Sequence, residues 1–164
     1  MLQTDSRKSN PDRFIRHKHR AVIEDHPISG PLMIASIDHL VLTTHDEAAC
    51  IAFYTELLGM RLDVFVGADG RSRKAFVFGT QKINLHLKGA EFEPKAHLPV
   101  PGAVDLCLIA AVPLDAVMQR LKSYPWPILE GPVNRTGALG PIRSIYLRDP
   151  DLNLIEISQY LEPA

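Results

Sequence analysis

The alternation of apolar and polar residues along the chain predicts the same order of elements twice. In the first half, the apolar run over residues 37–44 predicts a strand. Residues 50–58 then carry apolar side chains at the i, i+3, i+4, i+7 and i+8 spacing of an amphipathic helix, with Asp46 as N-cap and Gly59 just after the end. Three short strands separated by turn residues are predicted to follow, over residues 61–66, 74–78 and 82–87.

The second half repeats this order. Residues 104–110 predict a strand, and Pro113 suits the first turn of the helix that follows. A proline-rich connector, residues 91–101, separates the halves. Each half is therefore a βαβββ module, and we expect an α+β fold with one domain over residues 34–160, made of modules 34–90 and 103–160. The last three strands are predicted over residues 128–130, 143–147 and 154–160.

Polar residues interrupt the predicted strands on one face. Aligning the two halves places His39 opposite Asp105 and Asn84 opposite Glu156. Because side chains alternate along a strand, Asn84 and His86 share one face, and Glu156 points away from its apolar neighbours. We expect a curved mixed sheet from each module, with the polar concave faces lining a shared cavity.

Glu156 is a carboxylate inside an apolar run, and a buried charge is costly without a cation, a hydrogen-bond donor or water. A divalent metal ion shared with His39 would meet this need, and an ion pair with Arg143 or Arg148 is the alternative. A purely structural role is the alternative for His39. For Asp105, the alternative is a hydrogen bond to a backbone amide.

The glycine-bearing segment 134–141 predicts a long loop, and such loops often carry function. Arg135, Thr136 and Arg143 are candidates for binding an anionic or oxygen-rich ligand, because arginine binds carboxylate and phosphate well. Tyr146 follows on the next predicted strand. The alternative is a plain connection whose arginines are solvated.

Composition narrows the classes of partner. The chain has 164 residues, 46% hydrophobic and 23% charged, which suits one globular domain. A net charge of -1 favours neither nucleic acid nor an anionic membrane, and no apolar run is long enough to span a bilayer. Cys50 and Cys107 form no CxxC motif, so we expect free, buried thiols and a reducing, cytoplasmic location. Residues 1–33 are partly basic and lack the apolar core of a secretory signal, so we expect a flexible N-terminal extension.

Three motifs resemble the vicinal oxygen chelate superfamily, which includes glyoxalases, bleomycin-resistance proteins and extradiol dioxygenases. They are Ile37-Asp38-His39-Leu40-Val41-Leu42, Phe53-Tyr54-x-x-Leu57-Leu58-Gly59-Met60 and Arg148-Asp149-Pro150-Asp151-x-Asn153-Leu154-Ile155-Glu156. The segments Phe78–His86, Glu91–Ala96 and Gly131–Ala138 resemble the glyoxalase domain-containing protein 5 type more narrowly.

The resemblance implies a divalent metal, either Zn, Ni, Mn, Fe or Co, held by residues on strands one, four, five and eight. His39 and Glu156 match the family's pattern, while Asp105 stands where many members have histidine and Asn84 where many have glutamate or glutamine. The resemblance thus implies a metal site of His39, His86 and Glu156, with Asp105 either as a fourth ligand or as a hydrogen-bond partner of the ligands, and with Glu156 also as general base. Arg135, Thr136, Arg143, Tyr146 and Asn84 are the expected substrate-binding residues.

The resemblance implies one of two functions. The first is a metal-dependent lyase, isomerase or dioxygenase that acts on a small substrate with two adjacent oxygens. The alternative is a non-catalytic protein of the bleomycin-resistance type, which binds a small molecule. The family's paired modules also imply a homodimer, and symmetric dimers are the commonest oligomers.

Overall fold

The computed structural model describes residues 33–161, and the helices and strands among these residues lie in the unit that begins at Ser36. The predicted order of two successive βαβββ modules is confirmed. The first module consists of β1 (His39–Thr44), α1 (Glu47–Ile51), a π-helical continuation η1 (Ala52–Leu57), β2 (Arg61–Val66), β3 (Ser72–Phe78) and β4 (Gln81–Leu87). The second consists of β5 (Asp105–Ile109), α2 (Leu114–Leu121), β6 (Glu130–Thr136), β7 (Pro141–Arg148) and β8 (Leu154–Tyr160).

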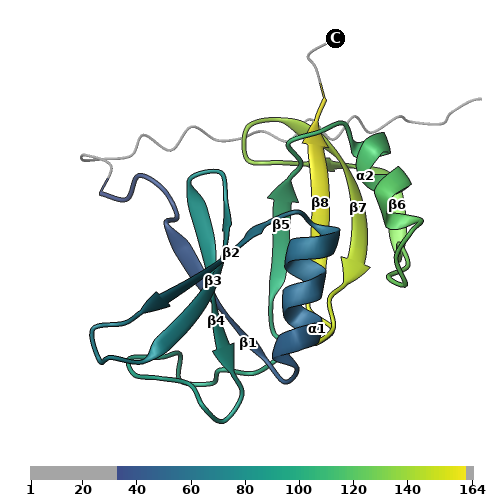
Figure 1. Ribbon diagram of the computed structural model, residues 1–164. Helices are drawn as coiled ribbons and strands as arrows, with labels where there is room; N and C mark the ends of the chain where they lie inside the picture. Colours follow the sequence, from purple (N-terminus) through teal and green to yellow (C-terminus); the bar gives the residue numbers. More distant parts are fainter. Residues whose placement is uncertain (1–32, 162–164) are drawn as a thin grey trace, which may run out of the picture. The chain divides into compact units, whose positions relative to one another are not determined.

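Each module forms its own four-stranded mixed sheet (Figure 1). The strand orders are β1-β4-β3-β2 and β5-β8-β7-β6. In both sheets the first and last strands of the module pair in parallel and the other pairs are antiparallel. The modules therefore have the same topology, and β1 and β5 are equivalent edge strands.

The predicted helix of the first module departs from α geometry in its second half. Asp46 caps it as predicted, because its Oδ1 accepts a hydrogen bond from Ala49 N at 3.0 Å, and Gly59 follows the end with φ +74°. Between them, residues 52–57 form π-helix, with Leu58 N donating to Phe53 O at 3.1 Å. Hydrophobic spacing does not distinguish π from α geometry at this length, so the sequence did not predict it.

The second strand of the second module is longer than predicted. Residues 128–130 were expected as the strand and 134–141 as a loop, but β6 extends to Thr136 and the turn is confined to residues 137–140. The glycines and Pro132 favoured a loop. Because β6 is an edge strand with a register shift between Glu130 and Val133, it accommodates a proline that a central strand would exclude. Arg135 and Thr136 therefore lie on a strand.

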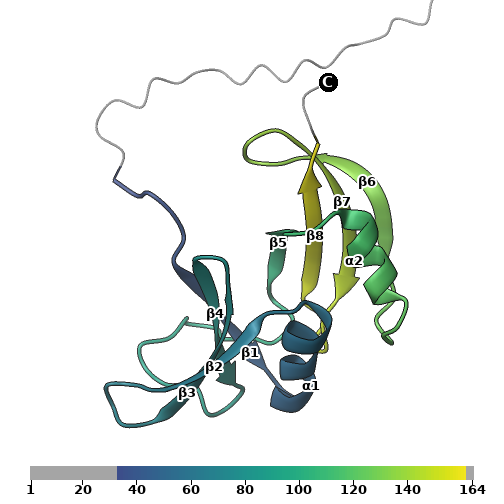
Figure 2. The same cartoon turned by 45° about the horizontal axis from the view of Figure 1, so that its top comes forward.

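The helix of the first module lies at the junction of the two sheets (Figure 1 and Figure 2). The ring of Tyr54 stacks on Phe76 of β3 at a centroid distance of 4.8 Å, and its hydroxyl donates to Asp149 Oδ2 at 2.9 Å, just after β7. His45 N also donates to Asp151 Oδ1 at 2.9 Å. The acidic turn before β8 is thus hydrogen-bonded to the first module through one buried contact, from Tyr54, and one exposed contact, from His45.

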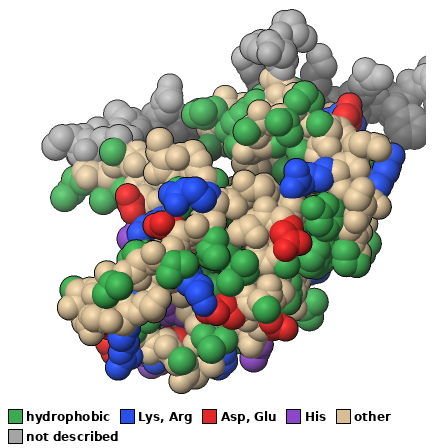
Figure 3. All heavy atoms as spheres, in the orientation of Figure 1, with side chains coloured by type: hydrophobic (Ala, Val, Ile, Leu, Met, Phe, Trp, Pro, Cys, Tyr) green, Lys and Arg blue, Asp and Glu red, His purple; other side chains and the backbone are tan. Residues whose placement is uncertain are grey.

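The apolar faces of both sheets pack on the helices. Fully buried side chains come from β1, β3, β4, β7, β8 and the helices of both modules, so a single core runs through both modules. On the face drawn in Figure 3, acidic and basic side chains are interspersed over the surface. No helix among residues 33–161 has the length and apolar character needed to cross a membrane.

Candidate functional site

Each sheet carries a pair of polar residues in the same relative position. In the first sheet, Val41 is the Cα partner of Asn84, so His39 lies two residues before Asn84 on the neighbouring strand. In the second sheet, Cys107 is the partner of Glu156, so Asp105 lies two residues before Glu156. At about 3.3 Å per residue and about 4.8 Å between strands, the two Cα atoms of each pair lie about 8 Å apart, close enough for their side chains to converge. We call these pairs the His39–Asn84 half-site and the Asp105–Glu156 half-site.

The structure separates His86 from His39. The Cα partner of His86 is Thr43, four residues beyond His39, which is about 13 Å along the strands. Because side chains stand roughly perpendicular to a sheet, the two imidazoles cannot converge on one ion. The ring of His86 instead packs against Phe92, with centroids 4.0 Å apart. The register of β1 and β4 therefore disfavours the expected metal site in which His39 and His86 bind the same ion.

His39 is oriented by the carboxylate of Asp38. Its Nδ1 lies 2.6 Å from Asp38 Oδ1, and this hydrogen bond is the main reason that the pKa of Asp38 is lowered. A carboxylate on Nδ1 fixes the tautomer and leaves Nε2 with a free lone pair, which is the common arrangement of metal-binding histidines. The half-exposed ring is accessible to a ligand, because its side chain is 44% exposed.

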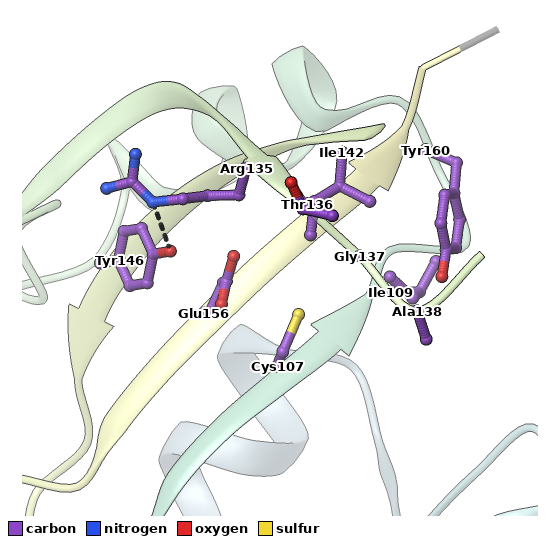
Figure 4. A pocket seen from close by; sticks show the side chains of 10 residues that line it. All are labelled: Cys107, Ile109, Arg135, Thr136, Gly137, Ala138, Ile142, Tyr146, Glu156 and Tyr160. Atoms are coloured by element: carbon purple, nitrogen blue, oxygen red, sulfur yellow. Dashed lines mark hydrogen bonds between the residues drawn. The ribbon is translucent and has the colours of Figure 1, made fainter. Parts of the chain in front are cut away.

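The second sheet carries a pocket of about 430 Å³ on its polar face (Figure 4). Four of the predicted site residues line it: Glu156, Tyr146, Arg135 and Thr136. Other lining residues, which the sequence did not indicate, come from strands of the same sheet and the turn after β6: Cys107, Ile109, Gly137, Ala138, Ile142 and Tyr160. The two-residue alternation that places Glu156 on this face also places Cys107, its Cα partner, and could have identified it. Cys107 is exposed, so the expectation of two buried thiols is wrong for this residue, whereas Cys50 is buried.

The hydrogen bonds to Glu156 come from neutral donors and not from a cation. Ser158 Oγ donates to Glu156 Oε1 at 3.2 Å, and Ser144 Oγ lies 2.8 Å from Ser158 Oγ. Burial by itself would raise the pKa of Glu156, but hydrogen bonds from Ser144, Tyr146, Ser158 and Cys107 outweigh it and the pKa is lowered. Glu156 is therefore an ionised carboxylate at neutral pH.

The alternative ion pairs for Glu156 are not formed. Arg143 Nη1 donates to Asp115 Oδ1 of α2 at 3.1 Å, and Arg148 Nη1 donates to Leu152 O at 2.9 Å. Arg143 lies on the helix-packing face of β7, apart from the other predicted substrate-binding residues, because it is offset by an odd number of residues from Tyr146.

Arg135 and Tyr146 form an ordered pair beside Glu156. Arg135 Nε donates to the Tyr146 hydroxyl at 3.1 Å, and its Nη2 donates to Glu130 Oε1 at 2.7 Å. Burial and the neighbouring Glu156 raise the pKa of Tyr146, so its phenol stays neutral at physiological pH and can donate a hydrogen bond. The pocket thus presents a carboxylate, a phenol and a guanidinium on one face (Figure 4).

The donors for a metal ion are divided between the two sheets. Within residues 33–161, no three His, Cys, Asp or Glu side chains come together as a metal site. The donor chemistry nevertheless suits one, because Glu156 is ionised without a cation and Asn84 Oδ1 is buried without a hydrogen-bond partner among these residues. Each half-site would need a second half-site to complete a ligand set.

The chain is similar to proteins of known sequence over most of its length. The model of the Glyoxalase/Bleomycin resistance protein/Dioxygenase superfamily matches residues 36–157. Virulence protein STM3117 of Salmonella typhimurium is 48% identical over 147 residues, which is 90% of this chain and 94% of that protein. Glyoxalase domain-containing protein RDO1 of Mycosarcoma maydis is 53% identical over 129 residues, which is 79% of this chain and 70% of that protein.

Solved structures agree on the fold. Integron cassette protein VCH_CASS1, from the mobile metagenome of V. cholerae, matches with a TM-score of 0.74 and 48% identity over 80% of this chain and 100% of that chain. Two structures at 20% identity share the fold alone. A lactoylglutathione lyase from Agrobacterium tumefaciens has a TM-score of 0.56 (77% and 94% covered), and TnmS3, an antibiotic binding protein from Streptomyces sp. CB03234, has 0.60 (80% and 100%).

Proposed function

Because this chain belongs to the glyoxalase/bleomycin resistance protein/dioxygenase superfamily, we propose that it is a metal-dependent enzyme acting on a small substrate with two adjacent oxygens. The observation that carries the proposal is the repeated half-site. His39–Asn84 and Asp105–Glu156 have the same register in their sheets, and an ionised Glu156 lies in a pocket of about 430 Å³. Resemblance of the 78–86, 91–96 and 131–138 segments supports the glyoxalase domain-containing protein 5 subgroup as a finer assignment.

The metal would be held by His39 Nε2 and Glu156, with Asp105 and Asn84 supplying oxygen at the equivalent positions. Imidazole and carboxylate suit Zn, Ni, Mn, Fe or Co, and the bound ion would supply a Lewis acid for adjacent substrate oxygens. Since the two half-sites lie on separate sheets, we propose that a homodimer brings the half-site of one chain to the complementary half-site of its partner.

The pocket residues have separate parts in this proposal. Glu156 is ionised and can accept a proton from a carbon or hydroxyl next to the substrate oxygens. Tyr146 donates its neutral hydroxyl to a substrate oxygen, and Arg135, held by Glu130, fixes its position. Thr136, on the same strand and in the lining, offers a further hydroxyl. Arg143 and His86 lie outside this arrangement.

The second candidate function is binding of a small molecule without turnover. The fold alone does not decide, because one scaffold hosts many chemistries and this one is shared by a lyase and an antibiotic binding protein. The observation that favours binding is that two positions depart from the family pattern: Asn84 stands where many members have glutamate or glutamine, and the exposed Asp105 stands where many have histidine. A cytoplasmic location is also proposed, on the strength of two free cysteines.

Elemental analysis of the purified full-length protein tests the proposal. We expect about one divalent metal per chain in the wild type, a loss in both His39→Ala and Glu156→Gln, and no change in His97→Ala, an exposed histidine of the connector. His86→Ala should keep its metal, because the register separates it from His39. A metal-free wild type after reconstitution with Zn, Ni, Mn and Fe(II) would refute the enzyme and favour the binding protein. Sedimentation of a monomer would refute the shared site.

A further inference from the structure

A second cavity, of about 120 Å³, lies on the polar face of the first sheet, beneath the connector between the modules. Residues 95–100 of the connector form one wall of this cavity. Aliphatic side chains make up most of its surface, from Val41, Ala96, Leu98, Pro99, Val100, Ala103 and Val104. The polar lining residues are Thr43, His86 and Lys95.

His86 is the feature that points to a ligand. The residue is 3% exposed, and its Nδ1 has no hydrogen-bond partner within residues 33–161. An unpaired buried polar atom costs about 1–3 kcal/mol, so such atoms are normally paired with protein, water or a ligand. Phe92 packs against the imidazole with centroids 4.0 Å apart and holds the ring in place.

Lys95 supplies the only charge in the lining of this cavity, as the structure describes it. Its ammonium lies 3.6 Å from Glu91 Oε2 and 3.7 Å from Glu93 Oε1. Both contacts are ion pairs longer than direct hydrogen bonds, so two carboxylates flank the ammonium while its N–H donors remain available to a ligand. Glu91 also lies near His86, and the other charged group there, Arg73, is paired with Asp69 at 3.1 Å and stacks on Phe92 at 3.8 Å.

We propose that this cavity binds a short-chain aliphatic monocarboxylate. The carboxylate would take hydrogen bonds from Lys95 Nζ and the His86 ring, and the alkyl chain would contact the aliphatic wall. A volume of about 120 Å³ corresponds to about four waters at roughly 30 Å³ each, which suits an acid of two to four carbons. This site does not depend on the metal, because His86 lies about 7 Å beyond Asn84 along β4 and about 13 Å beyond His39.

Butyrate is the probe. Saturation-transfer NMR on the full-length, metal-free protein should show butyrate bound and its neutral isostere butyramide unbound. Lys95→Gln should raise the Kd by about tenfold or more, because a hydrogen bond to a charged group is lost. His86→Phe keeps a ring against Phe92 but removes the nitrogen, and should weaken binding too. Lys122→Gln changes an exposed lysine at the C-terminal end of α2, is the matched control, and should bind as the wild type does.

Four results would overturn the proposal. Absence of a butyrate signal would show a cavity that holds only water. Equal binding of butyramide would show that the site does not recognise the negative charge of the carboxylate. Unchanged binding in folded Lys95→Gln would show that the acid binds elsewhere. Loss of binding in His39→Ala would show that the signal belongs to the half-site. Butyrate binding by a protein that takes up no metal would refute the proposed enzyme and leave this site standing.

Discussion

The buried hydrogen bond between the two modules can be removed by deleting one oxygen atom, the hydroxyl of Tyr54. Tyr54→Phe deletes the hydroxyl that donates to Asp149 Oδ2 at 2.9 Å and leaves the stacked ring in place. Tyr54 is 0% exposed and Asp149 is 2% exposed, so water does not replace the lost donor. Burial raises the pKa of Asp149, and the hydrogen bonds from Asn153 and Tyr54 act against that rise.

The expected loss follows from the partners that remain. In the variant, Asp149 keeps three donors: Asn153 Nδ2 at 2.8 Å and the backbone amides of Asp151 and Asn153 at 3.0 and 2.9 Å. The carboxylate therefore loses one hydrogen bond but is not left unpaired. Hydrogen bonds to charged groups contribute about 1.5–3 kcal/mol. We therefore expect the free energy of unfolding to fall by about 2 kcal/mol in Tyr54→Phe.

Urea denaturation at pH 7 and one fixed protein concentration, followed by far-UV circular dichroism, measures this loss. Tyr124→Phe is the matched control, because its hydroxyl donates to Glu56 O at 3.0 Å in an exposed setting where water can take its place. We expect a change within about 0.5 kcal/mol there. Equal losses in the two variants, or a Tyr54→Phe loss under about 0.5 kcal/mol, would refute the reasoning that this contact joins the modules.

Two further predictions concern Glu156 and a glycine beside the acidic turn. The folded-state pKa of Glu156 is lowered, so its stabilising contribution is full above the unfolded pKa of about 4.3 and is lost as pH falls through the folded value. The difference in unfolding free energy between wild type and Glu156→Gln should therefore shrink below about pH 4.3, and a difference that widens on acidification would contradict this sign. Gly102→Ala should destabilise more than Gly70→Ala, as thermal unfolding will show. Both have positive φ, at +80° and +78°, but only at Gly102 does a Cβ meet the backbone, 2.7 Å from Asp151 O. Equal melting temperatures for the two variants would show that the backbone yields there.

Local patterns along the chain were sufficient for the order of elements. Two periodicities, 2 for strands and 3.6 for helices, indicate both βαβββ modules, and the cap at Asp46 and the turn at Gly59 follow from the chemistry of single residues. The equivalence of His39 with Asp105 and of Asn84 with Glu156 also follows, because the two halves repeat one pattern and fold to one register.

Long-range pairing decided the rest. The extension of β6 to Thr136 depends on its pairing with β7 at the sheet edge, which local composition cannot reveal. The separation of His86 from His39 depends on the register between β1 and β4, strands about forty residues apart in the chain, and a shared face alone does not fix a distance along it. The cavity beneath the connector likewise exists only because residues 95–104 fold back over the sheet. Contacts between segments far apart in sequence are set by packing of the whole domain, and the alternation of side chains along a strand does not predict them.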